Sequence, residues 1–367
     1  MAMLQHPTDP KVREDRFAEA HGLTMGTRAH IMLYGGGDPE LELHRVRRLE
    51  HMWSRFIDGS ELSRVGRLDG APVIVSRETA MLLERSVEAW RRTAGLFDAT
   101  MLEHLEALGY DRSFDLLDSV DLNSIDSCGV NGKVDGSQRV AAPGPETRTE
   151  TGTLNSEAIS NSANLLIEAD VMTGQVKVPA GVRVDPGGIG KGLAADLVAI
   201  EAIRDGSEGA LVSIGGDMRA AGIPPDQGWE IVLDHHVADL ARINIRNGAV
   251  ATSTRLRRRW RTTAGVAHHV VDPRTHLPST GPAVAVSVLA SEAWWAEAVA
   301  TAVLVGFGTP GFDELADLLL ENVGALITTA DRCSHRLGPL GSAFLVSRGS
   351  SKGRAAAVHP DNGEDVT

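Results

Sequence analysis

The chain has little cysteine and no long apolar run. Its 367 residues contain two cysteines, Cys128 and Cys333, which lack the C-x-x-C spacing of zinc and redox motifs. This excludes a disulfide framework and a cysteine-rich metal site, and it fits a reducing compartment. Residues 1–17 contain no signal-peptide-like apolar stretch, and no later run reaches membrane-spanning length. We therefore expect a soluble, cytoplasmic protein without a transmembrane segment.

The charge balance disfavours a nucleic-acid partner. A formal net charge of −13 repels nucleic acid and anionic membranes unless a local basic patch overrides it. The candidate patch is the arginine-rich run over residues 255–263, "RLRRRWRTT". In one extended strand, alternate residues would place four arginines on one face and Trp260 on the other. Two interpretations stay open, a solvated or phosphate-facing strand and a nucleic-acid patch; the net charge favours the first.

The hydrophobic pattern predicts a mixed α+β fold. Apolar residues at three- and four-residue steps predict amphipathic helices in "LELHRVRRLEHMWSRF" and in "TAMLLERSVEAWRRTAG", the second ending at Gly95. In the C-terminal half, strand-like runs follow one another, interrupted only by helix-like runs beginning at Gly190 and Ser291. This order favours mixed or antiparallel sheets with packed helices over a doubly wound parallel sheet. We find no internal repeat.

One polar segment interrupts this pattern. Residues 115–181 are rich in Ser, Asn, Gly, Thr and Pro, which predicts a flexible insertion. We therefore expect one compact domain over residues 24–347 that carries this insertion. An N-terminal tail, 1–23, and a disordered C-terminal tail, 348–367, would flank the domain.

The glycine-rich stretch "VDPGGIGKGLAAD", residues 184–196, lies between a strand-like and a helix-like run. It is not a Walker motif, because Asp185 stands at the first glycine position and Gly192 replaces the hydroxyl residue after Lys191. The G-x-G-x-x-G dinucleotide fingerprint does not fit either. One interpretation is a helix N-terminus that binds an anion, with Lys191 adding positive charge and Asp185 accepting from a ligand. The other is a tight turn with glycines at positive φ and charges facing water.

Two further motifs carry candidate chemistry. Glu297 and Thr301 are four residues apart, so they share one helix face and could form half of a Mg²⁺ site. Alternatively, Glu297 lies at a wet edge and Thr301 bonds a carbonyl of its own helix. In "HHVVDPRTHLP", His268 and His269 would face opposite sides of a strand; one could accept a proton or contact phosphate, and a structural role is the alternative.

Two shorter signals are ambiguous when taken alone. Gly215 and Gly216 directly follow a strand-like run, which suits either close approach of a ligand or a sharp β-turn. Asp98 with Thr100 in "GLFDATM" is typical of a helix N-cap.

The ordered set of motifs is more specific than any single member. "TMGTRAHI", "MWSRFIDGSELSRV", "GLFDATM", "VDPGGIGKGLAAD", "SIGGDMRAAG", "ATSTRLRRRW", "HHVVDPRTHLP" and "AEAVATAVLVG" together resemble the ApbE family of FAD:protein FMN transferases. The resemblance covers residues 24–347 apart from the insertion. It implies a single compact α+β domain with the flavin nucleotide in a cleft. It also implies an enzyme that uses Mg²⁺ to cleave FAD, attaches FMN through a phosphoester bond to a Thr or Ser of an acceptor flavoprotein, and releases AMP.

The resemblance also implies roles for individual residues. The FAD-binding set would be Met25, Phe56, Phe97, Asp98, Asp185, Lys191 and His269. The Gly188 carbonyl, Glu297 and Thr301 would hold Mg²⁺. Lys191 would neutralise phosphate charge during catalysis, and His269 would assist proton transfer or phosphate binding.

Four positions depart from the family pattern. Glu297 stands where the family usually has aspartate, Phe56 where many members have tyrosine, Gly66 in place of asparagine and His276 in place of glycine. None removes the nucleophile, because the acceptor protein supplies it, so we expect an active enzyme. Three alternatives stay open: a Mg²⁺-dependent FAD pyrophosphatase that yields FMN and AMP, a non-catalytic FAD-binding protein, and a nucleic-acid-binding protein.

Overall fold

The fold is described from a computed structural model that covers residues 16–117, 119, 163–225, 228–235, 241–263 and 265–346. The outer part of the expected N-terminal tail, most of the expected insertion, the C-terminal tail and Cys128 lie outside the described residues.

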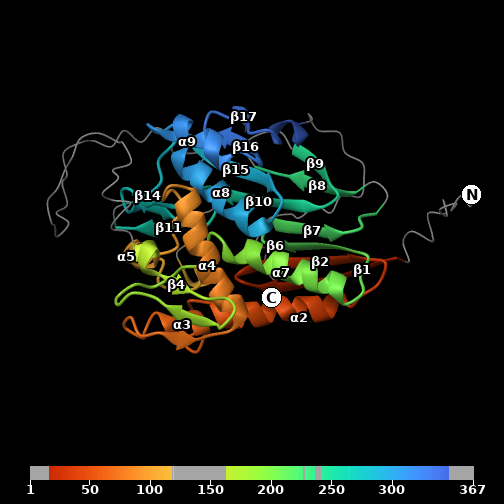
Figure 1. The fold of residues 1–367 in the computed structure, drawn as a ribbon. Helices are drawn as coiled ribbons and strands as arrows, with labels where there is room; N and C mark the ends of the chain where they lie inside the picture. Colours follow the sequence, from red (N-terminus) through yellow and green to blue (C-terminus); the bar gives the residue numbers. More distant parts are fainter. Residues whose placement is uncertain are drawn as a thin grey trace, which may run out of the picture.

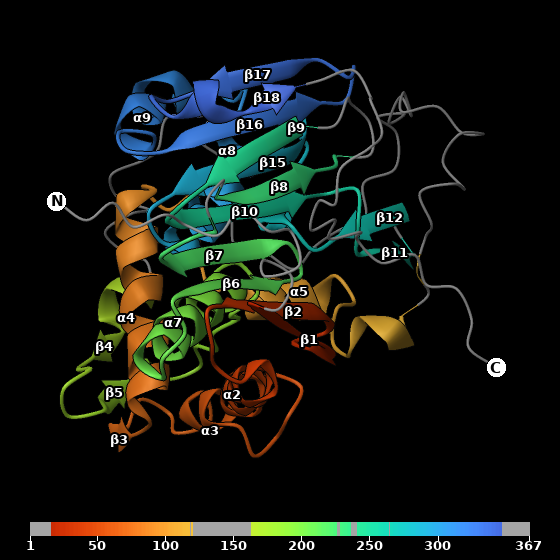
Figure 2. The same ribbon diagram turned by 90° about the vertical axis from the view of Figure 1, so that its right-hand side faces the viewer.

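One large antiparallel sheet forms the centre of the molecule. Its strand order is β1-β2-β6-β7-β10-β15-β16-β17, and each neighbouring pair is antiparallel. The figures show these strands stacked from β1 at one edge to β17 at the other (Figures 1 and 2). Their bounds are Phe17–Thr24, Thr27–Tyr34, Gly209–Ile214, Asp217–Gly222, Gly248–Thr254, Ala283–Ala290, Gly324–Thr329 and Ser334–Leu337.

Helices cover one face of this sheet (Figure 1). The helix α2 (Pro39–Trp53) packs on β1 and β2, α7 (Gly190–Arg204) on β6 and β7, and α8 (Ala293–Gly306) on β10 and β15. The helices α7 and α8 also contact one another, and α4 (Arg77–Arg92) packs against α2 and α8. The main apolar core lies between these helices and the sheet. The site described below is built where α7 and α8 meet.

A second, three-stranded sheet covers part of the other face. Its order is β18-β9-β8, with bounds Leu345–Val346, Ala241–Ile245 and Trp229–Leu233. Alternate residues of β8 and β9 are buried together with Leu211, Met218 and Val250 of the large sheet. This period-two burial is typical of sheets packed face to face.

Smaller elements complete the fold. A three-stranded sheet has the order β3-β5-β4, and two hairpins pair β11 with β12 and β13 with β14. The strand bounds are Val73–Ile74 (β3), Glu168–Ala169 (β4), Gln175–Lys177 (β5), Arg259–Thr262 (β11), Gly265–His268 (β12), Val271–Asp272 (β13) and Leu277–Pro278 (β14). The short helices are α3 (Glu61–Val65), α5 (Leu102–Ala107), α9 (Phe312–Leu319), η1 (Phe114–Leu116), η3 (Ala163–Leu166) and η4 (Gly341–Ala343).

The predicted α+β class with antiparallel sheets and packed helices is confirmed. The two predicted N-terminal helices are α2 and α4, and the chain after α4 takes positive φ at Ala94 and at Gly95, as the glycine stop suggested. No helix within the described parts of the chain has the length and apolar character needed to cross a membrane.

Two predicted boundaries are corrected, the end of the N-terminal tail and the end of the insertion. The strand β1 begins at Phe17, so residues 17–23 belong to the sheet rather than to a tail. Residues 163–181 contain η3, β4 and β5, and β5 pairs with β3 from the N-terminal half. The polar composition concealed these elements because they are short and because β5 also pairs with the distant β3. Buried Ile167 and Val176 anchor them in the main core.

The expected arginine strand is also corrected. The chain bends over residues 255–258, with Arg258 at φ 47°, and β11 begins only at Arg259. The four arginines therefore do not share one strand face. Trp260 is buried, and its indole N–H donates to the Leu108 carbonyl at 2.7 Å.

Candidate active site

The glycines before and within α7 allow close packing. None of Gly187, Gly188, Gly190 and Gly192 has a positive φ, so the interpretation as a positive-φ turn is wrong. A Cβ atom on Gly192 would lie 2.3 Å from the Ala293 carbonyl oxygen, and one on Gly188 would lie 2.8 Å from the Phe97 ring. These glycines therefore let α7 approach α8 and let the 186–189 loop approach Phe97.

A buried cluster of charges joins α7, α8 and β7. The Lys191 ammonium donates to Glu297 Oε1 and lies 2.9 Å from Asp217 Oδ2. The second Glu297 oxygen, Oε2, accepts from the backbone N–H of Gly192 at 2.8 Å. Glu297 is only 2% exposed, so the alternative that placed it at a wet edge is wrong. Two acids thus share one ammonium, which leaves a formal net negative charge in the interior.

The pKa values follow from this arrangement. Burial raises the pKa of Glu297 to about 8, against the attraction of Lys191, and repulsion from Asp217 adds to the rise. Burial also disfavours the ammonium form of Lys191, but Asp217 and Glu297 outweigh it and raise the pKa of Lys191 above its ordinary value. Lys191 therefore stays charged. Proton binding to Glu297 is favoured because the cluster lacks a second positive charge.

Oxygen atoms gather next to this cluster. The Thr301 hydroxyl lies one helical turn from Glu297 and pairs at 2.9 Å with the Ser253 hydroxyl on β10, not with its own helix. A Cβ atom added to Gly188 would lie 3.6 Å from Thr301 Oγ1 and against the Phe97 ring. The structure therefore brings Gly188, Phe97 and Thr301 together. Phe97 itself is buried in the main core.

Asp98 holds the loop that follows Phe97. Its Oδ1 accepts from the Thr100 N–H at 2.7 Å, from the Thr100 hydroxyl at 2.6 Å and from the Asn164 amide at 2.8 Å. It does not cap a helix: α5 begins at Leu102, and its N-cap residue is Met101. The expectation of an N-cap is wrong because the carboxylate closes a local turn instead.

Asp185 lies beside this loop and next to an arginine. Its backbone N–H donates to the Ala99 carbonyl at 2.7 Å, and its Oδ1 lies 3.6 Å from Arg55 Nε. The Arg55 guanidinium also stacks 4.4 Å from the centroid of the Phe56 ring, which is partly exposed. Arg55 thus links Phe56, where the family resemblance implied flavin stacking, to Asp185.

Met25 forms a tight hairpin turn with Gly26. Both residues have positive φ, 53° and 64°, as a two-residue type I′ connection requires. The Gly26 carbonyl accepts from Arg258 Nη2 at 3.3 Å. Arg258 adds a positive charge that lowers the pKa of His269 and opposes the rise at Lys191. The hairpin turn is thereby connected to the charged cluster.

The two adjacent histidines differ in role. The His268 imidazole donates from Nε2 to the Ser279 carbonyl at 3.1 Å, and Nδ1 accepts from the Val270 N–H at 3.3 Å. Burial lowers the pKa of His268 to about 4, which fits a neutral, structural residue. Burial and the charge of Arg258 lower the pKa of His269 well below its ordinary value. The Nδ1 atom of His269 is buried without a hydrogen-bond partner among the described residues, so it is a neutral acceptor that a ligand could satisfy.

The donor atoms of the cluster fit a hard divalent cation. Glu297 offers carboxylate oxygens, Thr301 a hydroxyl and Gly188 a carbonyl, and Mg²⁺ prefers such oxygen ligands. The formal charge of the buried acids exceeds that of Lys191 by one unit, which a cation would compensate. The longer Glu297 side chain reaches Gly192 N–H while it stays on the Thr301 face.

Several residues of the site escaped the sequence analysis. Asp217 directly follows the Gly215–Gly216 turn, so its position after a strand and two glycines was an available signal. Asp196 accepts from the N–H groups of Ala293 and Trp294, both at 2.9 Å, and so fixes the start of α8; burial raises its pKa to about 7. Arg258 belongs to the arginine-rich run over residues 255–263, whereas Arg55, Ser253 and Asn164 carried no separate sequence signal.

The fold and the site define an α+β protein that has an oxygen-rich site with two buried acids at the contact of two helices, beside a neutral histidine. A sequence profile described as the ApbE family matches residues 25–327, and the chain belongs to this family. It is similar to the FAD:protein FMN transferase of Treponema pallidum, with 26% identity over 352 residues, which is 88% of this chain and 86% of that protein. The FAD:protein FMN transferase of Vibrio cholerae is 26% identical over 302 residues, 77% of this chain and 80% of that protein.

Solved structures show the same fold. The ApbE protein of Thermotoga maritima superposes with a TM-score of 0.68 at 22% identity, covering 89% of this chain and 99% of that one. The flavinyl transferase ApbE of Pseudomonas stutzeri gives 0.66 at 18% identity, covering 90% and 98%. At these identities the two structures support the α+β architecture rather than individual site residues.

Proposed function

We propose that this protein transfers FMN from FAD to a Thr or Ser hydroxyl of an acceptor protein, in a Mg²⁺-dependent reaction that releases AMP. The single observation that carries the proposal is the cluster formed by Lys191, Asp217 and Glu297 with Thr301 and Gly188. It combines the donors that a divalent cation needs with a neutral histidine nearby. The family membership and the activity named for its relatives supply the substrate class.

The chain's own cations would bind the FAD pyrophosphate. The Lys191 ammonium is already ion-paired with Asp217 and Glu297, so its first role is to hold these two acids in place. Arg258, whose positive charge acts on both Lys191 and His269, would then meet phosphate oxygens, and its guanidinium fork suits them. Asp185 and Arg55 would contact the rest of the nucleotide, with Phe56 offering an exposed ring face to the flavin.

The chemical step needs an acceptor for one proton. The oxygen of the acceptor Thr or Ser attacks the phosphorus of the FMN half, the pyrophosphate bond breaks, and AMP leaves with its phosphate. His269 would take the hydroxyl proton at Nδ1, which has no hydrogen-bond partner among the described residues, and its lowered pKa keeps the imidazole neutral at neutral pH. The Gly188 carbonyl, Glu297 and Thr301 would hold Mg²⁺, which when bound stabilises charge that develops on the pyrophosphate oxygens.

The experiment incubates the purified protein with FAD, Mg²⁺ and an acceptor protein that carries a Thr flavinylation motif. The acceptor is then weighed by mass spectrometry, and AMP is quantified. We expect an FMN-sized mass gain with one AMP per modified acceptor, retained in Glu292→Gln and lost in Glu297→Gln. Glu292 is a matched control because it is exposed and directly precedes the same helix.

Two other outcomes would contradict the proposal. Equal amounts of AMP and free FMN, with several acceptors left unmodified, would identify a pyrophosphatase in which water is the attacking group. Tight FAD binding without AMP release under Mg²⁺ would identify a non-catalytic flavin-binding protein.

A further inference from the structure

A separate cluster of metal-ligand side chains lies on the hairpin of β1 and β2, apart from the charged cluster of α7 and α8. Glu19 and His21 are two residues apart on β1, so they share one face of the strand. His30 on β2 lies directly opposite His21 in the antiparallel register. All three side chains therefore stand on the same face of the hairpin, the face away from α2.

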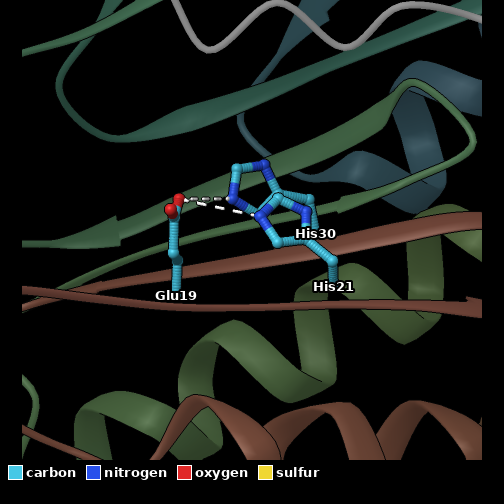
Figure 3. A group of neighbouring side chains, drawn as sticks. All are labelled: Glu19, His21 and His30. Atoms are coloured by element: carbon cyan, nitrogen blue, oxygen red, sulfur yellow. Dashed lines mark hydrogen bonds and ion pairs between the residues drawn. The ribbon is translucent and has the colours of Figure 1, made fainter.

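The three side chains converge. His30 Nε2 lies 3.1 Å and His21 Nε2 lies 3.8 Å from the same Glu19 oxygen, Oε2. The two imidazoles stack with their centroids 3.9 Å apart and an angle of 21° between their planes. In Figure 3 one nitrogen of each ring points toward the Glu19 carboxylate. One ligand atom from each residue lies within 4.8 Å of the other two.

We propose that Glu19, His21 and His30 bind a transition-metal cation of the Zn²⁺ class. Two imidazoles and one carboxylate form a ligand set that suits Zn²⁺ and Cu²⁺, and three protein ligands leave one position open for water or an external ligand. Tetrahedral Zn²⁺ with bonds of about 2.0 Å needs ligand atoms about 3.3 Å apart. The nitrogen-to-oxygen separations in the cluster bracket that value, so small side-chain rotations suffice.

The neighbouring strand adds an independent observation. Ser213 on β6 pairs directly with His30, so its side chain stands on the same face. Its hydroxyl is buried and has no hydrogen-bond partner among the described residues. A water on the open position of a metal bound at His30 would give this hydroxyl a partner.

The solvent exposure of Glu19 and His21 shows that packing does not force these side chains toward His30. The side chains of Glu19 and His21 are 60% and 63% exposed, whereas that of His30 is 18% exposed. Solvent would satisfy the two exposed groups separately, and burial does not force them together. The mostly buried His30 fixes one ligand direction, and the exposed Glu19 and His21 leave the open position accessible.

The test titrates chelator-treated, full-length protein with Zn²⁺ alone by isothermal calorimetry. We expect a Zn²⁺ site whose affinity falls by more than about tenfold in His21→Gln/His30→Gln, because removing ligands costs at least as much as removing their supporting partners. Glu19→Gln should weaken binding in the same direction. His44→Gln is the matched control, since His44 is an exposed histidine of α2, and it should bind as the wild type does.

A second measurement identifies the ligands without relying on one variant. Cu²⁺ bound at one equivalent should show hyperfine coupling to two imidazole nitrogens by electron paramagnetic resonance, and His21→Gln should show one. Because His21 is exposed, this single variant should keep its fold and guards against misfolding of the double variant. Unchanged Zn²⁺ affinity in the double variant, or no binding to the wild type, would overturn the proposal whether or not FMN transfer is observed.

Discussion

The charged cluster of α7 and α8 and the cluster on the β1–β2 hairpin are opposites in their physical support. The first is buried, and several contacts hold each of its side chains. Lys191, Asp217 and Glu297 are fixed by one another, by the Gly192 N–H and by two helices in close contact. The second stands largely in solvent, on an edge of the large sheet, and only His30 is substantially covered.

This difference separates two ways of making a site. In the interior cluster each buried charge is compensated by the others, so removing one of them should destabilise the fold. The hairpin cluster contributes little to folding, so its side chains are free to serve a ligand. Substitutions in the two regions should therefore differ in their effect on the free energy of unfolding.

Removing the ammonium of the interior cluster should lower the free energy of unfolding most. Lys191→Met leaves two buried acids without their cation, and we expect the free energy of unfolding to fall by about 3 to 5 kcal/mol. The matched control is Lys177→Met, because Lys177 forms an exposed ion pair with Glu168 at 3.1 Å. That change should cost less than about 1 kcal/mol. Urea denaturation measures both losses. Equal losses would show that the two buried acids do not depend on the Lys191 ammonium.

The contact between α7 and α8 should be nearly as sensitive. In Gly192→Ala the new Cβ would lie 2.3 Å from the Ala293 carbonyl oxygen, so the helices must separate. We expect a loss of about 3 kcal/mol. Gly59→Ala is the control, because a Cβ at Gly59 meets nothing within 4 Å. If thermal denaturation gave the two variants the same midpoint, the close approach would have no energetic role.

Acid should lower the free energy of unfolding through protonation of His268. Its pKa is about 4 in the folded protein, below the ordinary value of 6.5, so between these pH values the unfolded chain binds a proton that the folded chain does not. Stability therefore falls as the pH falls, by about 2 kcal/mol from this residue between pH 7 and pH 5. His268→Gln should remove that share of the pH dependence in urea melts. A variant with the wild-type pH slope would refute the assignment.

The hairpin cluster should tolerate substitution when no metal is added. His21→Gln replaces an exposed side chain, and we expect a change within about 0.5 kcal/mol. Urea melts in the presence of a chelator measure it. A loss comparable to that of Gly192→Ala would mean that the histidine stack supports the fold, and the contrast between the two regions would disappear.

Sequence reasoning reached the interior site because its residues lie in contiguous motifs. Gly188 and Lys191 share one stretch, and Glu297 and Thr301 share one helix face, so local spacing carries the information. It left open whether the glycines of residues 184–196 form a positive-φ turn or an anion-binding helix start. The close approach of a second helix was not predictable, because it depends on tertiary packing. His276, at φ 59°, occupies the left-handed conformation that explains the glycine usual there in the family, and its ring stacks on His104.

What the sequence did not predict depends on pairing across the chain. The hairpin cluster arises from strand register, which places His21 opposite His30, and no motif links the two. Asn164 reaches Asp98 from a segment whose polar composition suggested flexibility. The fold class could be predicted from element order, whereas these contacts join residues that are distant in sequence.

In the proposed function, Glu297 holds the cation on which FMN transfer depends. The most direct measurement is a Mg²⁺ titration of FMN transfer in the wild type, Glu297→Asp and Glu297→Gln, with the folded state of each variant verified by thermal denaturation. We predict that aspartate retains transfer with a shifted Mg²⁺ midpoint, and that glutamine loses more than about a hundredfold. A folded Glu297→Gln variant with the wild-type rate and Mg²⁺ midpoint would contradict the account.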